Sequence, residues 1–215
     1  ARQNHVGSVR PGVAVGAALA GMRPILVHQR VDFLLLTMDQ LVNHAGKWHN
    51  MFGGRQSVPL VVRAVVGRGW GQGAQHSQSL QAMFMHAPGI KVVLPSTAYD
   101  AKGLLLASIA DPNPVVFIEH RTLYDHTAEV PEEPYEIPLG KAAVRTTGSD
   151  VTIVGVSHMA FEATRAAEAL AARGYHVEVI DLRTIKPWDE QTVLESVRKT
   201  GRLVIADTGW RSAGV

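Results

Sequence analysis

The chain has 215 residues, of which 46% are hydrophobic and 19% charged, and this composition excludes a disordered, collagen-like or coiled-coil protein. The net charge is +2 and the Lys and Arg residues are scattered, so the sequence lacks the basic patch of a nucleic-acid-binding protein. It also lacks an apolar run near the ~20 residues of a membrane-spanning helix. The absence of cysteine excludes disulfides, Cys-ligated metal centres and a Cys nucleophile, and the absence of a signal-like segment favours a cytoplasmic protein.

Strand-like segments rich in Val and Ile alternate with helix-like segments through the first part of the chain. The predicted strands span residues 23–28, 58–66, 91–95 and 114–118, and the predicted helices span residues 32–50, 97–109 and a stretch that starts at Ser79. The run at 58–66 is almost continuously apolar, which is typical of a parallel strand buried on both faces. This alternation predicts an α/β fold with a mostly parallel sheet.

A segment rich in Pro and Glu, residues 125–139, interrupts this pattern and is predicted to be an extended interdomain linker. A second alternation follows, with predicted strands over 151–156, 176–180 and 202–206 and predicted helices over 160–173 and 189–199. The predicted domains are therefore residues 1–124 and 140–215. Three strands are few for an independent doubly wound domain, so we expect the chain to be part of something longer.

A glycine-rich segment, residues 67–73, follows the predicted strand 58–66. Its spacing is not G-x-G-x-x-G and no acidic residue follows about 20 positions later, which argues against a dinucleotide site. It is interpreted as a loop at the carboxyl end of a strand, where α/β proteins build their sites. The loop leads to His76, which is flanked by Gln75 and Ser77. His76 is placed either as a general acid or as a cap of the helix near Ser79, and the residues alone leave both open.

Seven segments carry a resemblance to a known family. They are residues 32–36, 73–79, 86–95, 99–105, 113–117, 132–135 and 179–187. From about Gly12 to Gly209 the chain resembles the β subunit of the thiamine diphosphate-dependent E1 component of 2-oxoacid dehydrogenase complexes, of the pyruvate or branched-chain type. The resemblance implies a pyrimidine-binding domain of the transketolase superfamily up to about Tyr124, and the start of a transketolase C-terminal domain from about Gly140. Relative to the family, parts of both ends are missing.

The resemblance also implies partners and an activity. A separate α subunit would hold the diphosphate and Mg²⁺ of thiamine diphosphate, in an α₂β₂ heterotetramer. The enzyme would decarboxylate a 2-oxoacid and pass the acyl group to the lipoyl domain of an E2 protein. Two alternatives stay open: an acyloin-forming or other C–C ligating relative, and a non-catalytic β-type subunit that stabilises an α partner.

Three site residues follow from the resemblance. Phe33 matches the aromatic residue that stacks on the aminopyrimidine of the cofactor, although a Phe on an amphipathic helix is otherwise commonly a core residue. Gln29 matches a position that lines the pyrimidine pocket, and an amide at the end of a buried strand is otherwise hard to satisfy. His76 matches the active-site histidine that faces the substrate carboxylate.

The glutamate that activates the cofactor has no counterpart, because its expected position is occupied by Gly7. The first eleven residues do not resemble the family. Two explanations compete: a segment that contains the Glu is not part of this sequence, or the subunit is degenerate and does not activate the cofactor.

A monovalent cation site is also implied, since family members with Asp-x-Asn-Pro after this helix bind K⁺. The matching residues are Leu60, Ser108, Asp111 and Asn113. The alternative is an ordinary turn, which Asp111-Pro112-Asn113-Pro114 forms without an ion.

Overall fold

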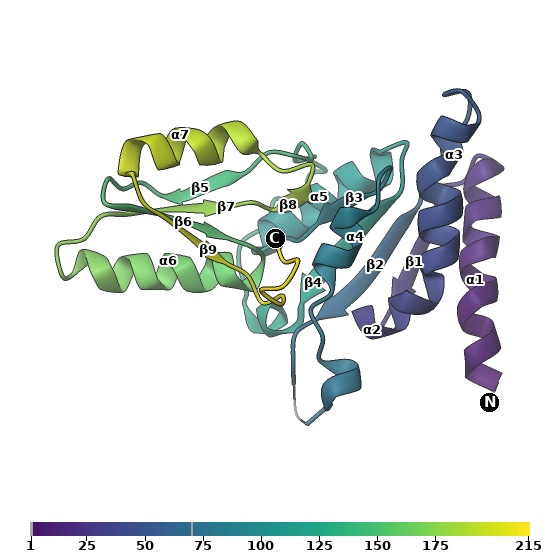
Figure 1. Cartoon of the computed structure of the whole chain (residues 1–215), viewed down its shortest axis with the longest axis horizontal. Coiled ribbons are helices and arrows are strands. Elements are labelled where there is room, and N and C mark those ends of the chain that lie inside the picture. The colour runs from purple at the N-terminus through teal and green to yellow at the C-terminus, as the bar shows by residue number, and fades with distance from the viewer. Residues whose placement is uncertain (1, 70) are drawn as a thin grey trace.

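The computed structural model describes residues 2–69 and 71–215, except for the side chains of residues 2–9. It contains two sheets that lie side by side, each flanked by helices (Figure 1). The α/β fold with mostly parallel sheets is confirmed. No helix within the described residues is long and apolar enough to cross a membrane.

The first sheet has the strand order β1-β2-β4-β3-β8. Its strands are β1 (Ile25–His28), β2 (Val61–Val66), β4 (Val115–His120), β3 (Lys91–Val93) and β8 (Thr184–Lys186). The first four are parallel to one another and β8 is antiparallel to β3. The central strands β2 and β4 are almost wholly buried, as their continuous apolar runs predict, whereas β1 is a half-exposed edge strand.

The helices of this part are α1 (Arg2–Leu19), α2 (Val31–Leu34), α3 (Gly46–Met51), α4 (Gln81–His86) and α5 (Ala98–Ala110). The predicted helix over 32–50 is helical throughout but is divided, because a 3₁₀ turn (Leu35–Thr37) and a π-helical segment (Asp39–Ala45) separate α2 from α3. Helix α5 begins where expected, since the Thr97 side chain accepts a hydrogen bond from the Asp100 N–H.

The second sheet has the order β5-β7-β6-β9. Its strands are β5 (Ala143–Thr146), β7 (Val177–Asp181), β6 (Val151–Gly155) and β9 (Leu203–Ala206). Strands β7, β6 and β9 are parallel and β5 is antiparallel. Helices α6 (His158–Ala171) and α7 (Glu190–Thr200) lie on opposite sides of this sheet (Figure 1). Asp189 caps the start of α7, and Gly201 ends it in the left-handed conformation.

Several predicted boundaries and elements need correction. The strand predicted over 58–66 begins at Val61, after Pro59, which has no N–H for the ladder. The strand predicted over 91–95 ends at Val93, and the helix predicted from Ser79 begins at Gln81. Helix α1 and strands β5 and β8 were not predicted at all.

The segment predicted as a linker is extended after a 3₁₀ segment (Arg121–Asp125), and it is docked along α5. Lys102 donates hydrogen bonds to the carbonyls of Pro131 and Glu132. The Ile137 side chain is buried, and its N–H donates to the Gly103 carbonyl at 3.2 Å. A Cβ at Gly103 would lie 2.7 Å from Ile137, so glycine permits this close approach. The exact domain boundaries stay a prediction.

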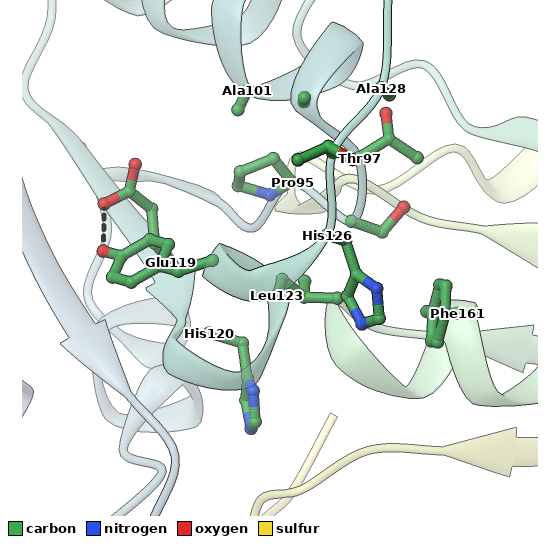
Figure 2. Close-up of a pocket in the computed structure, with 13 residues that line it drawn as sticks. Pro95, Thr97, Ala101, Glu119, His120, Leu123, His126, Ala128 and Phe161 are labelled. Atoms are coloured by element: carbon green, nitrogen blue, oxygen red, sulfur yellow. Dashed lines mark hydrogen bonds between the residues drawn. The ribbon is translucent and has the colours of Figure 1, made fainter.

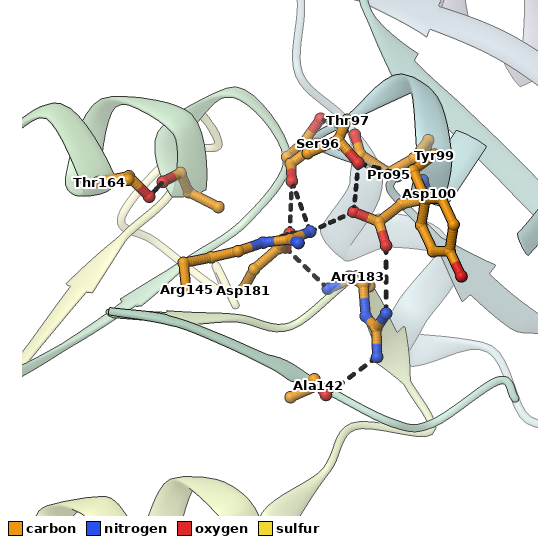
Figure 3. A network of polar contacts seen from close by, with 12 residues as sticks. Pro95, Ser96, Thr97, Tyr99, Asp100, Ala142, Arg145, Thr164, Asp181 and Arg183 are labelled. Atoms are coloured by element: carbon orange, nitrogen blue, oxygen red, sulfur yellow. Dashed lines mark hydrogen bonds and ion pairs between the residues drawn. The ribbon is translucent and has the colours of Figure 1, made fainter. Parts of the chain in front are cut away.

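A buried ion network joins the two sheets (Figure 3). Arg145 of β5 pairs with Asp181 of β7 at 2.6 Å and also with Asp100 of α5. Arg183 pairs with the other oxygen of Asp100 at 3.1 Å, and the Ser96 hydroxyl donates to Asp181. Burial raises the pKa of Asp181, and the guanidinium of Arg145 opposes that effect. Both carboxylates are nearly inaccessible to solvent, so the network depends on its two arginines for charge balance.

Candidate active site

The predicted site residues Gln29 and His76 follow two neighbouring parallel strands. Gln29 comes directly after β1, and His76 ends a 3₁₀ turn (Ala74–His76) at the end of the glycine-rich segment after β2. Because β1 pairs with β2 in parallel, the segments that follow them leave the same edge of the sheet. That edge is the usual position of a site in an open α/β sheet.

The structure brings Phe33 and His76 into contact. Their ring centroids are 5.1 Å apart, with an angle of 75° between the ring planes, which is an edge-to-face arrangement. The Phe33 side chain is 41% exposed, so Phe33 is not a core residue. His76 does not cap a helix, because α4 begins at Gln81 and its N-cap residue is Leu80. An accessible aromatic face and an imidazole therefore lie together at this edge.

Three contacts connect residues 30–33 to residues 76–78, and only the ring contact involves two predicted site residues. Arg30 donates hydrogen bonds from one terminal nitrogen to the carbonyls of Gly67 and His76. The Gln78 side-chain amide donates to Asp32 Oδ1 at 2.8 Å. Sequence reasoning did not find Arg30 or Asp32. The only sequence signal for these two residues is a pair of opposite charges at the junction between β1 and α2. Charged residues at such a junction are usually solvated, so this signal does not indicate a site.

The argument from burial for Gln29 is wrong, since β1 is an edge strand and Gln29 is exposed. An exposed amide there needs no protein partner, so its assignment to the pyrimidine pocket rests on the resemblance and stays a prediction. The prediction that Gly7 occupies the position of the cofactor-activating glutamate concerns residues 2–9, whose side chains lie outside the described part of the chain.

The residues of the predicted cation site lie around the C-terminus of α5, and oxygens of Leu60, Ser108 and Asp111 already have hydrogen-bond or ion-pair partners. The Ser108 hydroxyl donates to Leu104 O at 2.6 Å, and the Leu60 carbonyl accepts from the Val115 N–H at 2.9 Å. The Asp111 carboxylate pairs with Lys91 and accepts from the Asn113 N–H at 2.9 Å, as the turn alternative requires. The K⁺ site stays a prediction.

A cationic side chain also reaches this place. Arg23 donates to the carbonyls of Ile109 and Asp111 at 2.6 and 3.1 Å. A guanidinium thus meets the carbonyl end of α5, where positive charge is favourable.

Comparison with known families agrees with this architecture. The family described as "Transketolase, pyrimidine binding domain" matches residues 11–127, and "Transketolase, C-terminal domain" matches residues 140–215. The first match alone covers more than half of the chain. The chain belongs to the transketolase family. A solved structure described as "Split gene transketolase, inactive beta4 tetramer" has a TM-score of 0.79 over 94% of this chain and 63% of that chain, at 24% identity, which supports the shared fold.

Comparison with curated proteins shows which members of the family this chain resembles. The chain is 50% identical, over 91% of its length, to "Acetoin:2,6-dichlorophenolindophenol oxidoreductase subunit beta" of Cupriavidus necator, and covers 58% of that protein. It is 47% identical over 95% of its length to "Pyruvate dehydrogenase E1 component subunit beta" of Rhizobium meliloti, and covers 45% of it. It is 44% identical over 95% of its length to the mitochondrial pyruvate dehydrogenase E1 β subunit of Caenorhabditis elegans, and covers 59% of that protein. The resemblance to E1 β subunits is confirmed, and the chain spans 45–59% of the length of these relatives.

In this transketolase-family chain, His120 lies behind the glycine-rich segment, where the two matched domains meet. Its Nδ1 accepts a hydrogen bond from the Thr122 N–H at 3.3 Å, and its ring stacks on His158 of α6 with centroids 4.6 Å apart. A Cβ at Gly67 would lie 2.7 Å from the His120 ring. His120 lines a pocket of about 460 Å³. Figure 2 shows that His126 faces Phe161 in this pocket.

Stability is expected to depend on the protonation of His120. Burial, the neighbouring His158 and the Arg30 charge together lower the pKa of His120 to about 4. The unfolded chain binds this proton near pH 6.5, so the native state loses stability as the pH falls from about 6.5 to about 4. The shift corresponds to at most about 3 kcal/mol. His120→Asn keeps an acceptor for the Thr122 N–H and is expected to flatten the decline of unfolding free energy between pH 6.5 and 4.5. Identical slopes in both proteins would show that His120 does not carry the effect.

Proposed function

We propose that the chain acts as the β subunit of a 2-oxoacid dehydrogenase E1-type enzyme, which decarboxylates a 2-oxoacid with thiamine diphosphate and passes the acyl group to a lipoyl carrier. The observation that carries the proposal is the contact between His76 and the exposed ring of Phe33 at the carboxyl edge of the sheet. The names of the relatives support the same activity.

The residues at this edge suit the pyrimidine half of the cofactor. Thiamine diphosphate supplies the electron sink that decarboxylation of a 2-oxoacid requires. Phe33 offers an accessible aromatic face for stacking, and Gln29 offers an exposed amide for hydrogen bonding. His76 lies at the mouth of the site, where it orients the substrate carboxylate and donates a proton during acyl transfer.

The remaining parts of the site belong to partners in this proposal. An α subunit holds the diphosphate and Mg²⁺, in an α₂β₂ assembly, and the lipoyl domain of an E2 protein accepts the acyl group. A cytoplasmic location and a K⁺ ion near Asp111 are further parts of the proposal. The K⁺ ion is tested by comparing the thermal stability of the protein in K⁺ with its thermal stability in Na⁺.

A second candidate is an enzyme that cleaves an acyloin, which differs from the acyloin-forming relative that the sequence left open. The relative at 50% identity, whose name specifies acetoin and a dye acceptor, favours this second candidate. The same site residues would serve it, because cleavage of an acyloin and decarboxylation of a 2-oxoacid need the same electron sink.

One assay separates these activities. The β subunit and its α partner are loaded with thiamine diphosphate and Mg²⁺, and reduction of 2,6-dichlorophenolindophenol is measured with several 2-oxoacids and with acetoin. We expect cofactor-dependent turnover with a 2-oxoacid, and acyl transfer to a lipoyl domain. Turnover with acetoin alone would favour the second candidate. A complex that binds the cofactor but turns over neither substrate would indicate a non-catalytic β-type subunit.

A further inference from the structure

The glycine-rich segment and the 3₁₀ turn that follows it, together residues 67–76, are hydrogen-bonded at their first and last residues to one side chain. A single terminal nitrogen of Arg30 donates to the carbonyl of Gly67, the first residue after β2, and to the carbonyl of His76. The backbone between them, of which residue 70 is outside the described part, therefore has both of its ends fixed to the same guanidinium. Among the described residues, this contact joins the backbone of His76 to the segment that carries Phe33.

Arg30 is an unusual residue for such a position if stability alone is considered. Its side chain is 97% buried, since only 3% of the residue is exposed. Among the residues that the structure describes, its Nε and Nη1 atoms are buried without a hydrogen-bond partner, and none of the ion pairs includes it. A buried cation with unpaired donors and no ion pair is destabilising by itself. Burial lowers the pKa of Arg30, and the charge of the nearby Asp32, which raises it, offsets only part of this effect. Stability alone therefore does not account for an arginine at this position.

The neighbours of Arg30 hold the side chains on either side of the same junction. Asp32 accepts from Gln78, and Phe33 contacts the His76 ring. These two contacts restrain side chains, whereas Arg30 restrains the backbone from which the imidazole projects. The position of the His76 imidazole is therefore set through the backbone of His76. This matters for activity because small displacements of a catalytic group have large effects on rate.

We propose that Arg30 is a positioning residue, which closes the base of the glycine-rich segment and holds His76 against Phe33 at the active site. The expected effect of Arg30 on turnover rests on the proposed function, whereas its effect on the conformation of the segment does not. No substrate contact is assigned to Arg30.

The test compares Arg30→Met and Arg30→Lys with Arg63→Met as the matched control. Arg63 lies on β2, the strand that leads into the segment, and pairs with Glu119 at 2.7 Å, so the control removes a nearby arginine that has no described contact with the segment. Trypsin cleavage after Arg68, an exposed residue inside the segment, reports on its closure in the assembled αβ complex. Cleavage after Arg173, an exposed residue beyond α6, is the internal reference.

We expect cleavage after Arg68 to be at least tenfold faster in Arg30→Met, intermediate in Arg30→Lys and unchanged in Arg63→Met, with cleavage after Arg173 equal in all three. In the complex, kcat for acyl transfer is expected to fall at least tenfold in Arg30→Met, with less than a threefold change in KM for the 2-oxoacid. Arg63→Met is expected to stay within twofold of wild type.

Wild-type cleavage after Arg68 in both Arg30 variants would overturn the proposal, and so would loss of the fold in both, because Arg30 would then be a folding residue. If the wild-type complex has no activity, the proposed function fails while the cleavage rates still decide the role of Arg30. If the segment opens and turnover is unaffected, the positioning of His76 is refuted.

Discussion

Replacement of His76 by alanine is expected to lower acyl transfer to a lipoyl domain by ~10²-fold or more, the usual scale for loss of a positioned general acid. Release of carbon dioxide is expected to fall less, because that step depends on the cofactor more than on this imidazole. The fold should persist, since His76 is half-buried in a loop and contributes little to the core.

The measurement is a single-turnover comparison of carbon dioxide release and acyl-lipoyl formation in the αβ complex, with the melting temperature of each variant. His44→Ala is the matched control, because His44 is an exposed histidine on the π-helical segment. Wild-type acyl transfer by the His76 variant would refute its catalytic role. An unfolded His76 variant would instead show a structural role.

Loss of Arg145 is expected to reduce the free energy of unfolding by about 3–5 kcal/mol, the range for breaking a buried ion pair from one side. Its guanidinium pairs with Asp181 and Asp100, whose side chains are 0% and 1% exposed. Arg183 keeps one contact with Asp100, but Asp181 has no other ion pair among the described residues. Arg145→Met would therefore leave a buried carboxylate without charge compensation, at the junction of the two sheets.

Urea unfolding of Arg145→Met measures this loss, and Arg165→Met is the control. Arg165 lies on α6 and pairs with Glu162 at 3.2 Å, but its side chain is 64% exposed, so we expect a change below about 1 kcal/mol. A loss below about 1 kcal/mol in Arg145→Met as well would mean that Asp181 is neutral or rehydrated in the native state. The network would then not hold the two sheets together.

Elements with strong local signals were predictable. Strands β2 and β4 follow from continuous apolar runs, and α7 follows from acidic residues in its first turn and basic residues in its last. Helix α1 was missed because Pro11 lies inside it and its apolar residues have no clear helical period. Strand β8 has three residues and forms by pairing with β3, a partner about 90 positions away, so no local pattern marks it.

At the site, the candidate residues could be predicted from local sequence: the motif around His76, the aromatic residue Phe33 and the parallel strands that precede them. Tertiary structure decided which of them touch. The contact between the His76 and Phe33 rings, and the hydrogen bonds of Arg30 across 37 and 46 positions, depend on the way β1 and β2 pair. Tertiary structure also made β1 an edge strand, which removed the argument from burial for Gln29. Local sequence sets backbone preference and side-chain chemistry, whereas burial and long-range hydrogen bonds arise only when distant segments pack together.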